Sequence, residues 1–394
     1  MTSSKIILLC GAGYVSGKEI VALELAKGLI SRGFPLHVVS SSWNDGDFVR
    51  RLSDAGIDYE LMPTGFISAK LSLDCLRMTG EQMLRWPQLM WSYRKMLARE
   101  LPSAVIHTNW HHILLLRSFL RPHRDYLWLH ECVPNSNRYR YAYQHLAHRL
   151  RKVICVSHAV AESLLALGLS KEKVEIIHNG LTDCAGDQCR DHAINHINTN
   201  IGIAGQIGAW KGHEDLLIAF GLIAQQHSDV QLHVFGAGST EYVARLQDLA
   251  RTLNIDQRVI WHGFTSDRRR IYANLNICVV PSRSNDPLPT TALEAAFFGI
   301  PVIATCRGGL PEIVADNETG ILVDAENPEQ LSAALKRLLA DPLLRRKMST
   351  AARARATTYF CQTRFIDEFL CTLSLETSQS AHASPVPAVV AANQ

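Results

Sequence analysis

Short apolar runs recur along the chain, and the residues between successive runs are long enough to form a helix. In the first half they cover residues 5–10, 36–39, 104–108, 126–129, 153–156 and 174–177. In the second half they cover residues 200–205, 231–235, 258–261, 276–280, 302–304 and 320–323. Continuous apolar runs that alternate with helices are typical of parallel sheets buried on both faces. The pattern therefore predicts an α/β protein with two Rossmann-like domains.

A glycine-rich loop, Gly11 to Gly17, follows the first predicted strand and precedes a helix predicted over residues 19–31. A P-loop needs glycine five residues before a Gly-Lys pair, and Ala12 occupies that position. A dinucleotide-binding fingerprint needs a third glycine, and Ser16 occupies that position. Both motifs are therefore excluded. The interpretation as a nicotinamide-dependent dehydrogenase is then supported only by the paired Rossmann-like pattern.

The segment from residue 276 to residue 304 predicts a strand, a loop, a helix, a turn and a second strand. Thr290 or Thr291 can cap the helix. Gly299 and Pro301 end it, because glycine favours a helix terminus and proline cannot continue the helix. Ligands of parallel sheets bind beyond the carboxyl ends of the strands, so the loop in this segment is a candidate binding site.

Two carboxylates flank the start of this helix: Asp286 on the loop and Glu294 eight residues later. A helix amino terminus offers free N–H groups and a positive potential, which suit a phosphate. Carboxylates accept hydrogen bonds from sugar and ribose hydroxyls. The segment thus predicts a site for a sugar nucleotide. The alternative is that Asp286 is a turn residue and Glu294 an exposed helix residue.

A lysine lies on the loop that follows the strand at residues 200–205. Lys211 is a compact cation at the carboxyl end of that strand, where it can neutralise a departing diphosphate. The alternative is a surface lysine in a turn. The short helix predicted over residues 266–273 would approach the nucleotide base, and Asp267 and the three arginines 268–270 are expected to be solvated.

Length, charge and cysteine content limit the number of domains, the class of partner and the cellular compartment. A chain of 394 residues is long enough for two domains. Its net charge of +3 is too small to indicate nucleic acid as the main partner. The 10 cysteines form no Cys-x-x-Cys pair, which favours buried, reduced thiols in a cytoplasmic protein. Cys184 and Cys189 could chelate a metal, but no second pair has ligand spacing.

Two stretches, residues 66–100 and 137–152, interleave aromatic and apolar side chains with arginine and lysine. A basic amphipathic helix of this kind can lie on anionic lipid. The favoured interpretation is a helix with a core-facing apolar stripe and a solvated basic face. No apolar segment is long enough to span a bilayer, so any membrane contact would be peripheral.

The central segment also resembles a known family. The residues that carry the resemblance are Pro281, Ser282, Asp286, Leu293, Glu294, Ala295, Gly299, Ile300, Pro301 and Val302. They are similar to the Glu-x7-Glu segment of retaining, GT-B-fold glycosyltransferases of the glycosyl transferases group 1 (family four) type, with aspartate in place of the first glutamate. The resemblance extends to about Leu375 and is looser in the first half.

The resemblance implies two Rossmann-like domains that face a cleft, with a C-terminal helix crossing back to the first domain. The expected parts are a first, acceptor-side domain (residues 1–181), a linker (182–199), a donor-binding domain (200–357), the crossover helix (358–376) and a disordered tail (377–394). The tail lacks aromatic residues, which also favours disorder.

The reaction implied is transfer of a sugar, with retention, from a nucleoside diphosphate sugar of UDP or GDP type to a hydroxyl of an acceptor glycan or glycolipid. The pathway implied is synthesis of cell-surface polysaccharide or glycolipid. No cofactor and no metal are expected, because the charge of the departing diphosphate would be carried by protein groups instead. The catalytic residues implied are His130, Lys211 and Asp286. The donor-binding residues implied are Gly17, Gln206, Lys211, Asp286, Leu288, Pro289, Thr290, Thr291 and Glu294.

One residue departs from the family pattern. The family carries an arginine where Gln206 stands, five residues before Lys211. Glutamine can donate hydrogen bonds but brings no charge. The alternative function is therefore a catalytically weak or inactive protein that binds sugar nucleotides.

Overall fold

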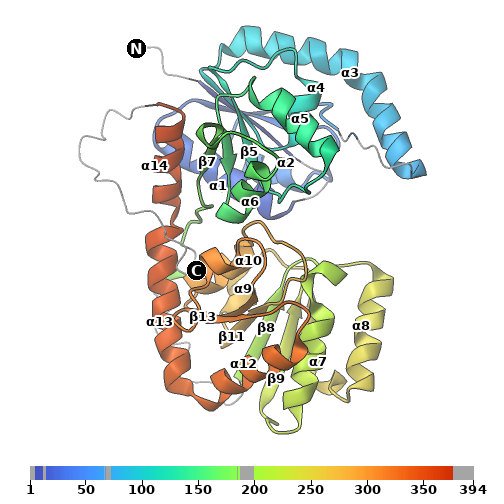
Figure 1. Cartoon of the computed structure of the whole chain (residues 1–394), viewed down its shortest axis with the longest axis vertical. Coiled ribbons are helices and arrows are strands. Elements are labelled where there is room, and N and C mark those ends of the chain that lie inside the picture. Colours follow the sequence, from blue (N-terminus) through green and yellow to red (C-terminus); the bar gives the residue numbers. More distant parts are fainter. Residues whose placement is uncertain are drawn as a thin grey trace. The chain divides into compact units, whose positions relative to one another are not determined.

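The chain forms two compact units in a computed structural model that describes residues 5–11, 15–65, 67, 72–183, 185–186 and 199–375 (Figure 1). The first unit comprises the residues up to Gly180 and the helix that begins at Gln362. The second unit runs from Leu181 to Cys361. Each unit contains one parallel sheet, as the alternation of apolar runs and helices predicts.

The sheet of the first unit is parallel throughout, in the order β3-β2-β1-β4-β5-β6-β7. Its strands are β1 (Ile6–Cys10), β2 (Leu36–Ser41), β3 (Tyr59–Met62), β4 (Ala104–His107), β5 (Asp125–Leu129), β6 (Val153–Cys155) and β7 (Val174–Ile176). Every residue of β1, β2, β4 and β5 is buried, which explains their unbroken apolar runs. The strand order reverses between β1 and β4, where doubly wound sheets bind ligands.

The helices of the first unit are α1 (Gly17–Ser31), α2 (Asp47–Asp54), α3 (Leu73–Glu100), α4 (Trp110–Leu115), α5 (Asn137–Ala147), α6 (His158–Leu165) and α14 (Gln362–Thr372). Helix α1 starts with a capping box, in which the side chains of Ser16 and Glu19 satisfy backbone N–H groups. The Ser16 backbone N–H donates to the Glu19 carboxylate over 3.0 Å. This box fixes the start of α1.

The last described helix, α14, packs in the first unit although it comes from the far end of the chain (Figure 1). Its Phe365 and Phe369 contact the buried Trp128 of β5, with ring centroids 5.8 and 5.0 Å apart. The Gln362 amide donates to the Glu24 carboxylate of α1 over 2.9 Å. The predicted return of the C-terminal helix to the first domain is thus confirmed.

The sheet of the second unit is also parallel, in the order β10-β9-β8-β11-β12-β13. Its strands are β8 (Thr199–Ala204), β9 (Val230–Phe235), β10 (Val259–Gly263), β11 (Ile277–Val280), β12 (Val302–Thr305) and β13 (Gly320–Val323). Its helices are α7 (His213–Ala224), α8 (Thr240–Thr252), α9 (Arg268–Tyr272), α10 (Thr290–Phe297), α11 (Leu310–Ile313), α12 (Pro328–Ala340) and α13 (Pro342–Tyr359). The strand order reverses between β8 and β11, so their loops are neighbours at the carboxyl edge.

Two local predictions need correction. Neither Thr290 nor Thr291 caps α10: the N-cap position is Pro289, and no side chain caps the helix. Proline is suited to this position because its fixed φ and missing N–H are compatible with a helix start. The crossover helix predicted over residues 358–376 spans Gln362–Thr372 as α14, and a short break after Tyr359 separates it from α13.

The predicted core-facing stripe of α3 is confirmed only in part. Leu89 and Met96 are buried as expected, but Leu84 and Trp91 are 83% and 65% exposed. No helix among the described residues is both long enough and apolar enough to cross a bilayer. The positions of Phe66, Cys184, Cys189, most of the predicted linker and the predicted tail lie outside the described residues.

Candidate functional site

The carboxyl edge of the second sheet brings a lysine and an aspartate together from two neighbouring strands. Lys211 lies between β8 and α7, and Asp286 lies on the loop between β11 and α10. The Lys211 Nζ is 2.5 Å from Asp286 Oδ2, and the Ser282 hydroxyl is 3.3 Å from the same oxygen. Both charged side chains are partly exposed. The pair fixes the cation at the sheet edge while leaving it accessible to a ligand.

Two glycines allow the loops to approach this closely. Gly212 has φ +71°, and a Cβ there would lie 1.9 Å from the carbonyl oxygen of Pro281. Gly308 has φ +57°, and a Cβ there would lie 2.0 Å from the carbonyl oxygen of Asp286. The Gly309 N–H donates to that oxygen over 2.8 Å. Any larger residue at either glycine would both strain the backbone and push the loops apart.

An arginine ties the loop after β11 to the start of α7. The Arg283 guanidinium donates to both oxygens of Asp215, over 2.7 and 2.6 Å, and to Glu214 over 3.2 Å. Its backbone N–H donates to the Trp210 carbonyl over 2.8 Å. The hydrogen bonds to the Asp215 carboxylate raise the pKa of Arg283. Such paired hydrogen bonds are geometrically specific, so they hold the loop in one position.

Glu294 lies on α10 and is buried, and both of its carboxylate oxygens accept hydrogen bonds. The Arg268 guanidinium of α9 donates to Oε1 over 3.1 Å, and the Tyr272 hydroxyl donates to Oε2 over 2.9 Å. Burial and the Glu294 charge hold the pKa of Tyr272 far above its usual range, so this hydroxyl remains a donor. A carboxylate oxygen has two lone pairs and can accept more than one hydrogen bond.

This geometry overturns two interpretations. Glu294 is not an exposed helix residue, because only 6% of it is accessible. The prediction that Arg268 is solvated is wrong, whereas Asp267, Arg269 and Arg270 are exposed as expected. The Asp267 carboxylate caps α9, which leaves the Arg268 side chain to reach Glu294.

The amino terminus of α10 lies between Asp286 and Glu294 and has no side-chain cap. Leu288 and Pro289 are buried, so only their backbone atoms are available to a ligand. Thr290 and Thr291 are partly exposed. An uncapped helix start retains N–H groups that can bind an anion.

Two predicted site residues lie in the first unit, at the carboxyl edge of its sheet. Gly17 is the first residue of α1, and His130 directly follows β5. The His130 ring is 4.3 Å from that of Trp128, and its Nε2 is buried without a hydrogen-bond partner among the described residues. Burial, and then the charge of Lys18, hold the pKa of His130 well below its usual range. His130 is therefore neutral at neutral pH.

Two family models match the chain, one in each half. Residues 15–183 match the model of Glycosyltransferase Family 4, and residues 187–355 match that of Glycosyl transferases group 1. The chain belongs to the group 1 glycosyltransferases. This confirms the family suggested by the central segment.

Solved structures confirm the GT-B fold of this group 1 glycosyltransferase. HepE of Anabaena, solved with UDP and glucose, aligns with a TM-score of 0.77 at 20% identity over 94% of this chain and 99% of HepE. Sucrose-phosphate synthase of Thermosynechococcus elongatus aligns with a TM-score of 0.74 at 20% identity over 93% of this chain and 97% of the synthase.

Relatives by sequence match over shorter spans. D-inositol 3-phosphate glycosyltransferase of Corynebacterium jeikeium is 35% identical over 170 residues, which are 41% of this chain and 40% of that protein. A glycosyltransferase of Haemophilus influenzae is 30% identical over 163 residues, which are 41% of this chain and 45% of that protein. The chain spans about half the length of the curated relatives it matches.

Within this group 1 glycosyltransferase the predicted site residues fall into two sets. The second unit carries Gln206, Lys211, residues 286–291 and Glu294, and Gln206 is exposed just after β8. Gly17 and His130 belong to the first unit. Sequence reasoning missed Tyr272 and the role of Arg268, although their i, i+4 spacing puts both on one face of a helix.

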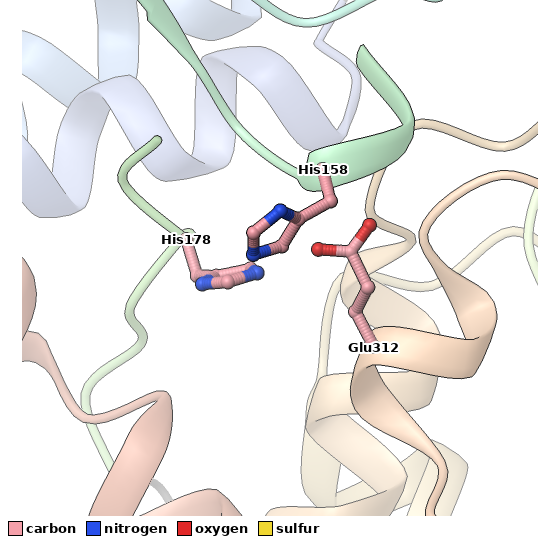
Figure 2. Close-up of side chains that lie close together, drawn as sticks. All are labelled: His158, His178 and Glu312. Carbon is pink, nitrogen blue, oxygen red and sulfur yellow. The ribbon is translucent and has the colours of Figure 1, made fainter. Parts of the chain in front are cut away.

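The first unit of the glycosyltransferase contains a further histidine pair that the sequence did not single out as a site. Figure 2 shows His158, the first residue of α6, and His178, which follows β7. Their ring centroids are 5.8 Å apart. The Ser157 hydroxyl caps α6 by accepting from the Val160 N–H over 3.2 Å. Glu312, also drawn in Figure 2, belongs to α11 of the second unit.

Proposed function

We propose that this protein transfers a sugar from a nucleoside diphosphate sugar to an acceptor hydroxyl. The observation that carries the proposal is the Lys211–Asp286 pair beside the uncapped start of α10. A cation and free N–H groups suit a diphosphate, while carboxylate oxygens suit sugar hydroxyls. The site thus offers groups for both parts of a sugar nucleotide.

In this proposal Lys211 and the start of α10 stabilise the negative charge on the departing diphosphate. Preorganised charges act most strongly where charge develops in the transition state. Asp286 accepts from the donor sugar, and Glu294, oriented by Arg268 and Tyr272, accepts from the ribose. His130 is neutral, so its ring can hydrogen-bond near the sugar without adding charge.

The donor is proposed to be of UDP or GDP type. HepE, which shares the fold, binds UDP, glucose and UDP-glucose, and this supports a UDP sugar. The proposed acceptor is a glycan or glycolipid used for cell-surface polysaccharide or glycolipid synthesis, at the cytoplasmic face of the membrane. We further propose retention of configuration, with no metal, because Lys211 supplies charge that a metal would otherwise supply.

A second candidate function is binding of a sugar nucleotide with weak or no transfer. It is favoured by Gln206, which is exposed and neutral where the family pattern has arginine. Lys211 would then act alone on the diphosphate.

The deciding experiment is a panel of UDP and GDP sugars tested first by thermal shift and then for donor hydrolysis. A ligand at about 100 times its dissociation constant adds roughly 2.7 kcal/mol to stability, which a thermal shift detects. Binding with turnover supports transfer, and binding without turnover supports the second function. A lack of binding to every donor contradicts both. Activity should persist in EDTA, and a loss that magnesium restores would contradict the metal-free mechanism.

A further inference from the structure

Helix α3 carries a concentration of exposed apolar side chains. Seven of the fifteen large apolar residues exposed among the described residues lie on this helix: Leu73, Leu76, Met78, Met83, Leu84, Trp86 and Trp91. Large patches of contiguous exposed apolar surface are rare on monomeric soluble proteins and usually mark an interaction site. In Figure 1 the first half of α3 extends beyond the sheet of its own unit.

The buried and exposed residues define two opposite faces of α3. The buried face consists of Gln82, Leu89, Tyr93 and Met96. At about 100° per residue, the opposite face consists of Leu73, Leu76, Arg77, Gly80, Leu84, Pro87, Trp91, Arg94, Lys95 and Ala98. We call this the outer face of α3. An ordinary surface helix directs polar residues outward, but here the outward stripe is apolar, with Leu73 and Leu84 87% and 83% exposed.

Charge on the outer face has one sign. Arg77, Arg94 and Lys95 are exposed at its margins, and the Lys95 ammonium lies 5.3 Å from the centroid of the Trp91 ring. The acidic residues Asp74 and Glu81 lie about a quarter-turn from the centre of the outer face, just beyond the margin that carries Arg77 and Lys95, and Glu100 lies on the buried side. Arg77 also pairs with Glu81, but such an exposed pair contributes little.

We propose that the outer face of α3 binds the surface of an anionic membrane. An apolar stripe with tryptophan and basic margins matches a helix that lies in the headgroup region, with its apolar side toward the acyl chains. The stretch from Leu73 to Trp91 is about 27 Å long at 1.5 Å per residue. It contains Pro87, and α3 is bent in Figure 1, so the contact would follow a bent helix.

A second copy of the chain fits this face less well. A symmetric contact places the same patch on both sides, so the cations Arg77, Arg94 and Lys95 would face one another. Anionic headgroups neutralise these charges instead. The inference goes beyond the proposed function and does not depend on it, because membrane binding requires no donor.

The test is co-sedimentation of the full chain with vesicles of phosphatidylglycerol and phosphatidylcholine in equal parts, and with phosphatidylcholine alone. We expect binding to the anionic vesicles to be at least about tenfold stronger and to fall as salt rises, because salt screens exposed charges. Neutralising Arg77, Arg94 and Lys95 to glutamine should weaken binding about a hundredfold, since each basic residue near the surface contributes about 1 kcal/mol.

The double variant Leu84→Glu, Trp91→Glu should lose binding at least about tenfold, because it puts charge into the apolar stripe. The matched control is Leu343→Glu at an equally exposed leucine of α13, 79% accessible, and should bind as the wild type does. Melting curves of all variants should coincide, since the changed side chains are exposed. Equal binding by the double variant would overturn the proposal. So would absence of vesicle binding together with self-association that the double variant removes.

Discussion

The carboxyl edges of the two sheets differ in the ionisable groups that carry the candidate chemistry. At the edge of the second sheet, charged groups are paired: Lys211 with Asp286, and Arg268 with Glu294. At the edge of the first sheet, His111, His112 and His130 all have pKa values lowered mainly by burial. The charge of Lys18 lowers all three further.

The difference teaches what each edge is suited to bind. Cations that carboxylates already hold in position can pair with a charged ligand such as a diphosphate, because they need little rearrangement when the ligand binds. Neutral imidazoles can hydrogen-bond an uncharged hydroxyl without the cost of desolvating an ion. The comparison agrees with a donor side in the second unit and an acceptor side in the first, as proposed.

The largest expected effect tests the carboxyl edge of the second sheet, which we call the charged edge. Lys211→Ala should lower sugar transfer by about two to three powers of ten, as for removal of one preorganised charge. The measurement is donor turnover with the natural acceptor, or donor hydrolysis if the acceptor is unknown. Lys347→Ala, at an exposed lysine of α13, serves as the control and should keep wild-type activity. Unchanged activity in Lys211→Ala would remove this residue from the mechanism.

The second effect tests the carboxyl edge of the first sheet, where the buried histidines are neutral, through the pH dependence of the free energy of unfolding. Burial, Lys18 and Arg138 lower the pKa of His111 to about 4 from its ordinary 6.5. Above pH 6.5 the histidine is neutral in both states and contributes no pH dependence. Between pH 6.5 and about 4 only the unfolded chain takes up the proton, so the free energy of unfolding falls as pH falls, by about 3 kcal/mol in total.

The measurement for this second effect is thermal unfolding at pH 7 and at pH 4.5. His111→Gln should lose less stability between these two pH values than the wild type. The dependence will not vanish, because burial also depresses the pKa values of His112 and His130. An identical pH dependence in wild type and variant would mean that His111 is not held neutral by burial.

The third effect compares two neighbouring arginines of α9, only one of which pairs with Glu294. Arg268→Ala should raise the donor KM on the order of tenfold, because a hydrogen bond to a charged group contributes about 1.5–3 kcal/mol and here it orients Glu294. Arg269→Ala removes the next arginine, which is exposed, and should leave KM unchanged. Steady-state kinetics over a range of donor concentrations checks both. Equal KM values would show that the Arg268–Glu294 pair is irrelevant to the donor.

The smallest effect concerns the position where the charged edge departs from its family. Gln206→Arg adds a charge to the diphosphate site, which should change the rate by about tenfold and at most about a hundredfold, since a charged hydrogen bond exceeds a neutral one by on the order of 1 kcal/mol. Donor turnover of wild type and variant is the readout. If wild type binds donor without turnover while Gln206→Arg gains turnover, the second candidate function is correct.

The site was predictable from sequence where its residues are close along the chain. Asp286, the start of α10 and Glu294 fall within nine residues, so strand, loop and helix signals place them directly. The partners of Glu294 come from α9, more than twenty residues earlier, and only packing of α9 against α10 brings Arg268 and Tyr272 to it. On α3 the interleaved apolar residues predicted one core-facing stripe, but Leu84 and Trp91 are exposed while Leu89 and Met96 are buried. Which apolar residues are buried depends on packing partners distant along the chain.

The sequence by itself determined the two parallel sheets, the strand ends that carry the candidate residues, and the family. These follow from local signals: apolar runs, glycine and proline at turns, and one conspicuous segment. The tertiary structure decided that Lys211 pairs with Asp286, that Glu294 is buried, that His130 is kept neutral, and that the apolar stripe of α3 faces outward. The physical reason is that pairing, burial and pKa depend on neighbours distant along the chain, and no local pattern encodes them.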